Sequence, residues 1–256
     1  MRLALWPGLA LALACAGGRL YYSLSDLPLL ENDPNLPVAP GPWPSVPAVI
    51  SDEAQVPDSL VLPTLQALMS LPGAAASCDA GGQPLPGAAE YCVGLYKTPQ
   101  EWRVTWPIRK VEEEHSACKP PFGGVDDADW GRGLPIFGYA HNHPCGLFAS
   151  SADLTTSFPA TKSPEGIWVL VGYATSPSGE PARDAQGQVI PAWGWLATGQ
   201  ADTPRFYKWN PEGEVFRWNG ETKRWEFQAR CKPQPPSMMI RKPLPPKCSP
   251  ELIDWY

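Results

Sequence analysis

Two histidines, His141 and His143, stand two residues apart near the end of an apolar and aromatic segment that stops at Pro144. Successive side chains of a β-strand point to opposite faces of a sheet, so this spacing places both imidazoles on one face. Imidazole nitrogens are frequent zinc ligands, and two of them on one face can bind a single ion. The pair predicts a metal site at the end of a strand, and the alternative is a surface strand end without metal.

A third candidate ligand, Asp153, follows His143 by ten residues. The run Ser150-Ser151-Ala152-Asp153 has the pattern of a helix start, where a carboxylate in the first turn is favoured by the helix N-terminus. Three protein ligands leave one coordination position for water, which is the open arrangement of a catalytic zinc ion. The competing interpretation of Asp153 is an ordinary helix-capping carboxylate.

The segment from Gly138 to Pro144, followed by Ser150 to Asp153, resembles the His-x-His-Pro and Ser-x-x-Asp motif of the JAMM, or JAB/MPN, zinc metallopeptidases. The resemblance is greatest to the prokaryotic JAB branch and covers about residues 58 to 200. It implies an α/β (α+β) fold in which a mixed β-sheet is flanked by helices. It also implies zinc as the cofactor and a peptide or isopeptide bond as the substrate. The zinc ligands that it implies are His141, His143 and Asp153.

Members of that family also have a glutamate upstream, and Glu90, which precedes an apolar aromatic segment, fits its place and type. The resemblance makes Glu90 the general base and Ser150 a stabiliser of the oxyanion, with Ser151 as the alternative for the second role. The interval between His143 and Asp153 is one residue shorter than the family pattern. A non-catalytic binding module on the same fold is therefore the second hypothesis for the protein. The alternative for Glu90 is a solvated residue at the start of a strand, without a catalytic role.

The N-terminus has the pattern of a secretory signal peptide over residues 1–18, with Arg2 before an apolar run. Small residues flank Cys15, as in the lipobox of bacterial lipoproteins, which predicts a lipid anchor on Cys15. A simple secretory cut after Ala16 is the alternative. Both alternatives predict an exported protein, either a membrane-anchored lipoprotein or a secreted one.

Six further cysteines, an even number, suit three disulfides in an oxidising compartment. Among 15 possible pairings, Cys231 with Cys248 would staple the C-terminal tail, and Cys118 with Cys145 would brace the loop beside the histidines. The chain has no Cys-x-x-Cys spacing, which argues against a structural zinc site.

The formal net charge of −6 and the absence of a Lys/Arg block predict no nucleic-acid partner. Beyond the first residues, the sequence has no apolar run of about 20 residues, the length of a membrane-spanning helix. The resemblance implies a protein or peptide substrate, and contact with a membrane is expected only through the N-terminal lipid.

The remaining sequence predicts the helix and strands that position these residues. A proline-rich tether is expected over residues 19–57, and the hydrolase domain over 58–200 begins with a helix capped by Asp58-Ser59 and delayed or kinked by Pro63. A polar loop is expected over 112–133. Alternating or aromatic runs predict the following strands: 90–96 and 102–106, joined through Thr98-Pro99, then 134–143, 166–175 and 189–196.

The C-terminal region, residues 201–256, predicts a small aromatic β-meander with turns such as Asn219-Gly220, followed by a proline-rich tail. Its tryptophans Trp209, Trp218 and Trp225 have two interpretations. Packing against the main sheet is one, and an exposed aromatic platform for a partner or polymer is the other.

Overall fold

The computed structural model describes residues 21–24, 27–31, 39–75, 78–79, 85–109, 118, 124–145, 149–150, 153–154, 183, 186–232 and 246–251. The signal peptide with Cys15, the predicted strand 166–175, and residues 233–245 of the C-terminal tail lie outside the described residues. None of the described helices has the length and apolar character needed to span a bilayer.

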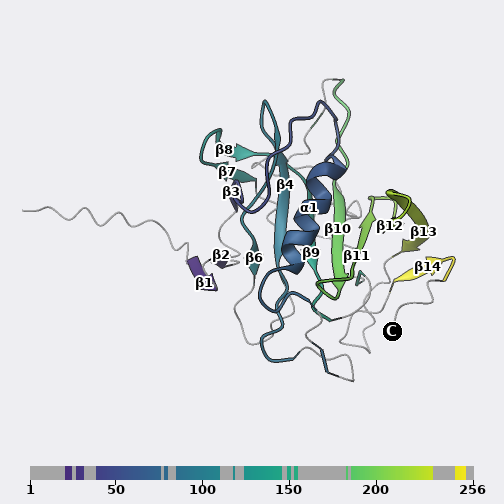
Figure 1. The fold of residues 1–256 in the computed structure, drawn as a ribbon. Coiled ribbons are helices and arrows are strands. Elements are labelled where there is room, and N and C mark those ends of the chain that lie inside the picture. Colours follow the sequence, from purple (N-terminus) through teal and green to yellow (C-terminus); the bar gives the residue numbers. More distant parts are fainter. Residues whose placement is uncertain are drawn as a thin grey trace, which may run out of the picture.

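The fold is mixed α+β and consists mostly of sheet with one complete helix, α1 (Asp58–Met69), packed on it (Figure 1). The large sheet is mixed and runs in the order β1-β2-β6-β4-β9-β10-β11-β12-β13-β14, with β5 paired to β4. Its strands are β1 (Tyr21–Leu24), β2 (Leu27–Glu31), β4 (Cys92–Lys97), β5 (Trp102–Val104), β6 (Ile108–Arg109), β9 (Ile136–Asn142), β10 (Trp193–Gly199), β11 (Pro204–Trp209), β12 (Glu214–Asn219), β13 (Arg224–Lys232) and β14 (Lys247–Ser249).

Strand β9 is central because it pairs antiparallel with β4 and parallel with β10. All of its residues are buried, as expected for a strand covered on both faces. Ala140 packs toward α1, whereas Tyr139 belongs to a second apolar cluster with Leu154 and Trp209 on the opposite face. The strand predicted over 134–143 is confirmed, and the two histidines come at its end on the face away from α1.

Two glycines allow indoles to lie directly on this central pair of strands. A Cβ at Gly138 would overlap the ring of Trp195, and a Cβ at Gly194 would overlap the ring of Trp209. The close approach at Gly194 brings Trp209 against the face that carries the histidines.

Helix α1 begins at Asp58 and includes Pro63, so the predicted late start is wrong. The hydrogen bond that Pro63 cannot donate would go to Ser59, an exposed residue whose carbonyl water can reach. The predicted cap is also wrong, since the N-cap is Pro57 without a side-chain hydrogen bond. Asp58 instead accepts a 2.8 Å hydrogen bond from Nε1 of Trp225, which ties the helix to β13.

The hairpin predicted through Thr98-Pro99 is confirmed as the antiparallel pair β4 and β5. The predicted polar loop 112–133 contains two strands, β7 (Val125–Asp127) and β8 (Gly131–Leu134), and the loop prediction is wrong there. They form a small sheet with β3 (Ala39–Gly41), a partner more than 80 residues away that local composition cannot reveal.

Residues 39–56 differ from the expected extended tether, because they pack on the domain. Trp43 is fully buried in the main core, and its N–H donates to the Val104 carbonyl at 2.8 Å. Proline-rich composition indicates extended backbone, yet an extended segment can also lie along a folded core when its apolar side chains are buried.

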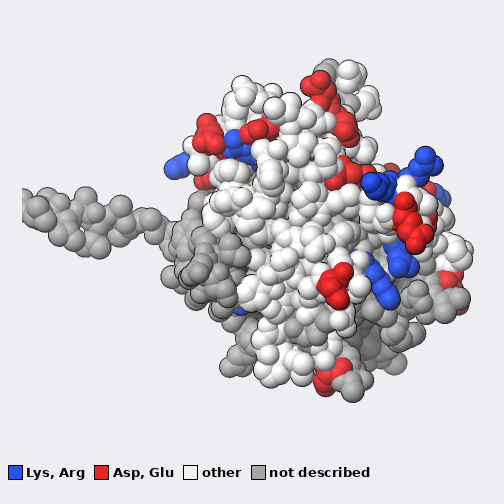
Figure 2. All heavy atoms as spheres, in the orientation of Figure 1, with Lys and Arg blue, Asp and Glu red and all other residues white. Residues whose placement is uncertain are grey.

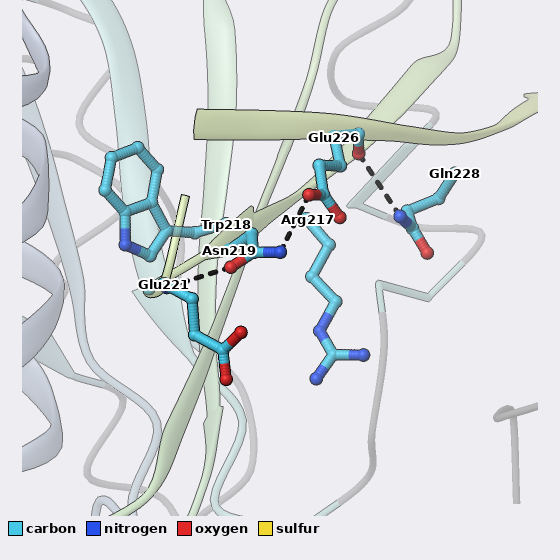
Figure 3. A pocket seen from close by; sticks show the side chains of 7 residues that line it. Arg217, Trp218, Asn219, Glu221, Glu226 and Gln228 are labelled. Atoms are coloured by element: carbon cyan, nitrogen blue, oxygen red, sulfur yellow. Dashed lines mark hydrogen bonds between the residues drawn. The ribbon is translucent and has the colours of Figure 1, made fainter. Parts of the chain in front are cut away.

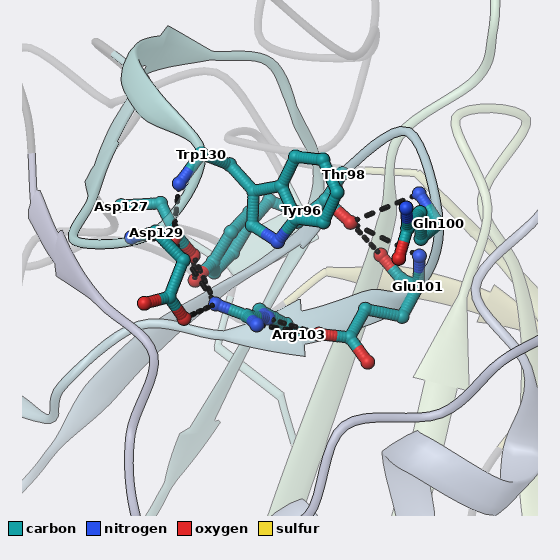
Figure 4. A network of polar contacts seen from close by, with 8 residues as sticks. All are labelled: Tyr96, Thr98, Gln100, Glu101, Arg103, Asp127, Asp129 and Trp130. Carbon is teal, nitrogen blue, oxygen red and sulfur yellow. Dashed lines mark hydrogen bonds and ion pairs between the residues drawn. The ribbon is translucent and has the colours of Figure 1, made fainter.

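A polar network joins the small sheet to the large one (Figure 4). Arg103 of β5 contacts Asp127 at 3.0 Å and Asp129 at 2.8 Å, and it also pairs with Glu101. The hydroxyl of Tyr96 donates to Asp127, whose side chain is fully buried. The buried carboxylate therefore has a guanidinium and a hydroxyl as partners.

Strands β11 to β13 confirm the predicted meander, and they extend the large sheet rather than form a separate unit, because the whole of β11 pairs with β10. The strand predicted over 189–196 begins later, at Trp193, and Val189 before it forms an isolated bridge with Arg183.

Three disulfides are present among the described cysteines, which is consistent with an extracellular protein. The predicted pair Cys231–Cys248 is confirmed and joins β13 to β14. The predicted pair Cys118–Cys145 is wrong: Cys92 bonds Cys118, and Cys78 bonds Cys145. Pairing follows tertiary proximity, which cysteine spacing does not encode.

Candidate metal centre

The pairing of β4 with β9 brings Glu90 to the two histidines. Cys92 lies directly opposite His141, and the Asn142 N–H donates to the Tyr91 carbonyl at 3.3 Å. Continuing the antiparallel alignment by one more residue places Glu90 opposite His143, on the same face. The ligand atoms of Glu90, His141 and His143 accordingly all lie within 4.8 Å of one another.

Asp153 completes a compact set of donor atoms with the histidines. The Nε2 atoms of His141 and His143 are 3.2 Å apart, and Asp153 Oδ1 lies 3.2 Å from Nε2 of His141. Asp153 Oδ2 lies 3.4 Å from Nε2 of His143. Ligand atoms bound tetrahedrally at about 2.0–2.2 Å from zinc stand roughly 3.3–3.6 Å apart. The three distances are therefore close to those between zinc ligands, with one Asp153 oxygen facing each imidazole.

Asp153 is also part of a helix cap, and its two carboxylate oxygens have different partners. Oδ2 accepts hydrogen bonds from the Ser150 N–H at 2.6 Å and from the Ser150 hydroxyl at 2.7 Å. The Asp153 N–H donates back to Ser150 Oγ at 3.2 Å, and the Leu154 N–H donates to the Ser150 carbonyl, as in a first helical turn. The cap fixes the carboxylate, while Oδ1 faces His141, so the capping and metal-binding interpretations are compatible.

Ser150, predicted to stabilise an oxyanion, is held by these contacts to Asp153 and is exposed to solvent. Its predicted alternative, Ser151, lies outside the described residues. In this structure Ser150 therefore orients a candidate ligand, which is the usual role of a hydrogen-bond partner behind a metal ligand.

Two aromatic rings pack against His141. His141 is 1% exposed, stacks on Tyr139 at 5.6 Å between ring centroids, and meets the edge of Trp209 at 6.0 Å. The Tyr139 hydroxyl also donates to the Asp153 carbonyl at 3.1 Å. Sequence reasoning gave Tyr139 no role, although its position two residues before His141 on the same face was the available signal.

Burial raises the pKa of Glu90 to about 7, against the nearby His143 and His141, which lower it. A carboxyl group of this kind can accept and release a proton near neutral pH. Burial acts in the same direction on Asp153, but His141 and His143 outweigh it and hold the pKa of Asp153 well below its ordinary value. The two carboxyl groups thus differ in character: Asp153 stays ionised, and Glu90 is poised to exchange a proton.

Two of the disulfides brace this centre. Cys92 lies opposite His141, and Sγ of its partner Cys118 is 3.5 Å from Glu90 Oε1. Cys145 follows His143 by two residues and is tied to Cys78. The atoms of Glu90, Cys92 and Cys118 also lie close enough to hold a metal, but a disulfide offers no thiolate.

A second feature that could bind a ligand is a polar hollow of about 540 Å³ at the β12–β13 hairpin (Figure 3). Arg217 and Gln228 line it, together with Glu226, which accepts a 2.7 Å hydrogen bond from Asn219. On the face shown in Figure 2, blue and red side chains are interspersed over this end of the molecule. The hollow therefore offers charges of both signs.

The three tryptophans of the meander do not form one platform. Trp209 is fully buried, which confirms packing as its role, whereas Trp218 and Trp225 are half-buried and pack edge to face at 5.3 Å. Phe227, which sequence reasoning overlooked, is 52% exposed on β13.

Comparison with known proteins gives no match: neither a protein-family model, nor a curated protein, nor a solved structure is significantly similar to the chain.

Proposed function

We propose that the protein is an exported zinc-dependent hydrolase of the JAMM type that cleaves a peptide or isopeptide bond. The single observation that carries the proposal is the convergence of His141, His143 and Asp153 at zinc-ligand spacing, with Glu90 beside them.

The donor set fits zinc better than a hard cation. Calcium and magnesium prefer shells built of oxygen atoms, whereas two imidazoles and one carboxylate form a known catalytic zinc set. Asp153 is held ionised by its histidine neighbours, and the Nε2 atoms of both imidazoles point toward each other and toward its oxygens. In the proposal, these three residues would hold the ion, which when bound supplies Lewis-acid chemistry and a nucleophile at neutral pH.

Glu90 is the proposed general base. Its carboxylate lies within reach of the histidine nitrogens without sharing the cap that holds Asp153, so it can accept the proton of an attacking water. The same group then delivers that proton to the amine leaving group. Ser150 would donate a hydrogen bond from its hydroxyl to the oxyanion, which requires that hydroxyl to leave Asp153 Oδ2.

The second candidate function is a non-catalytic binding module that recognises a surface polymer or protein partner through its aromatic C-terminal region. The hollow beside Arg217 and the exposed ring of Phe227 favour it. The burial of Trp209 removes that tryptophan from any such surface. Binding that survives a chelator and is lost in Phe227→Ala would support this candidate.

Export is proposed on two grounds: the disulfides, which suit an oxidising compartment, and the signal-peptide pattern with a lipid anchor on Cys15. Mass spectrometry of the mature N-terminus tests the anchor. A diacylglycerol adduct on Cys15 supports it, and an unmodified N-terminus at Gly17 indicates simple secretion.

The test of the hydrolase proposal pairs Glu90→Gln with the wild-type chain. The variant should retain about one zinc per chain by elemental analysis yet lose at least about 100-fold in turnover of a quenched fluorescent peptide pool. Full activity in Glu90→Gln would overturn the assignment.

A further inference from the structure

The residue between the two histidines, Asn142, points to the opposite face of β9, toward α1. It is fully buried, and its carboxamide has complete hydrogen bonding. Oδ1 accepts from the Tyr91 N–H at 2.8 Å, and Nδ2 donates to the carbonyls of Ala89 at 2.9 Å and Ala74 at 2.8 Å.

Two of these three bonds go to the residues on either side of Glu90. The regular ladder between β4 and β9 ends at the pair Cys92 and His141, so Glu90 stands beyond the strand. Here the Asn142 carboxamide takes the place of a neighbouring peptide group, because it offers one donor and one acceptor to the Ala89 carbonyl and the Tyr91 N–H. The backbone of Glu90 is thereby held although it lies outside the ladder.

The third bond fixes a loop behind Glu90. Asn142 donates to Ala74, the Ala89 N–H donates to the Gly73 carbonyl at 2.9 Å, and the Tyr91 hydroxyl donates to the Pro72 carbonyl at 2.6 Å. The segment 72–74 therefore supports residues 89–91 from the face opposite to the centre.

We propose that Asn142 is a positioning residue that sets the distance between Glu90 and the histidine pair. This inference rests on the proposed function of Glu90 as general base. The same strand end carries the histidines and, through Asn142, the backbone on both sides of Glu90, so that base and ligands move as one unit. Displacement of a catalytic group by about 1 Å can cost on the order of 100-fold in rate.

The chain offers a matched control in Thr105, which follows β5 and binds an amide of β4. Thr105 is also fully buried, and its Oγ1 accepts a 2.9 Å hydrogen bond from the Gly94 N–H, four residues beyond Glu90. Thr105→Val removes one buried acceptor of a strand amide, as Asn142→Ala does, but it does so away from the centre.

The experiment compares the zinc-loaded wild type with Asn142→Ala and Thr105→Val. Three quantities are measured: zinc content, hydrogen exchange of individual amides by NMR, and turnover of the quenched fluorescent peptide pool. Asn142→Ala should keep zinc, exchange the Tyr91 amide at least about 10-fold faster, and lose about 10- to 100-fold in kcat with little change in KM. Thr105→Val should free the Gly94 amide instead and keep kcat within about twofold.

The outcomes separate this role from the proposed function. If Asn142→Ala keeps wild-type turnover while its Tyr91 amide exchanges faster, or if it loses zinc together with activity, the positioning role is overturned and the hydrolase proposal stands. A wild-type chain without zinc or turnover overturns both. Should Asn142→Ala fail to fold, Asn142→Ser, which has room for a bridging water, replaces it under the same criteria.

Discussion

Two clusters of carboxylates in this molecule are built differently. In the network of Figure 4, Asp127 and Asp129 contact the guanidinium of Arg103, which is always charged. In the candidate centre, the Asp153 carboxylate contacts two imidazoles, whose charge depends on a proton. The first cluster is complete with the residues of the chain and joins two sheets. The second cluster brings two imidazoles, which are potential metal ligands, to the Asp153 carboxylate, and one cation could bind all three groups.

The largest expected effect breaks the second cluster. The double variant His141→Ala/His143→Ala removes two of three proposed ligands, so its zinc affinity should fall by at least about 1,000-fold, while Arg103→Ala keeps zinc. Isothermal titration with zinc measures both. Equal zinc affinity in the histidine variant and the wild type would contradict the proposed ligand set.

The next effect breaks the first cluster. Arg103→Ala leaves the buried Asp127 carboxylate without its guanidinium, and the free energy of unfolding should fall by about 3–5 kcal/mol. The control is Asp129→Ala, which removes a side chain that is 63% exposed and should cost less than about 1 kcal/mol. Urea unfolding of the two variants measures the difference, and similar losses in both would show that Asp127 does not depend on Arg103.

Two disulfides, one beside the candidate centre and one in the meander, allow a comparison in which the expected loss of stability is similar. Replacing Cys92 and Cys118 by serine, or Cys231 and Cys248, opens loops of 26 and 17 residues and should cost about 3 kcal/mol in either case. Because only Cys92 and Cys118 adjoin His141 and Glu90, only their loss should also weaken zinc binding, by about 10-fold. Equal zinc affinity in both double variants would show that the Cys92–Cys118 bond has no part in the centre.

The smallest expected effect is a pH dependence in the first cluster. Burial alone would raise the pKa of Asp127, but the hydrogen bond from Tyr96, the Asp129 N–H and Arg103 outweigh burial and lower it. A lowered folded-state pKa means that the stabilisation is complete above the unfolded pKa of about 3.9 and is lost as the pH falls through the folded value. When the pH is lowered below about 4, the stability of Asp127→Asn should therefore fall less than the stability of the wild type falls, as measured by thermal unfolding. An unchanged acid profile in Asp127→Asn would remove Asp127 as the source of the effect.

Part of this arrangement is predictable from the sequence because it follows from local periodicity. The two-residue spacing of His141 and His143 and the cap at Ser150 and Asp153 are local patterns, and the structure reproduces both. Glu90 is harder to place, since its approach to the histidines depends on the register between β4 and β9. The sequence suggested this glutamate only through its resemblance to a family motif.

Other features are not encoded locally. The pairing of Cys92 with Cys118 and the pairing of β7 with β3 depend on which segments meet in space. The role of Asn142 is likewise invisible in the sequence, because a carboxamide between two histidines gives no sign of which backbone groups it will bind. Burial of Trp43, Val46 and Val56 was hidden by the proline content of this segment, which indicates extended backbone but not what that backbone packs against.

The most direct test of the metal centre is X-ray absorption at the zinc edge on the zinc-loaded, oxidised protein. Two imidazoles and a carboxylate predict a first shell of nitrogen and oxygen only, at about 2.0–2.2 Å, with the outer scattering of two imidazole rings. A shell of sulfur at about 2.3 Å would instead place the ion on cysteine thiolates and contradict the account, as would a protein that takes up no zinc.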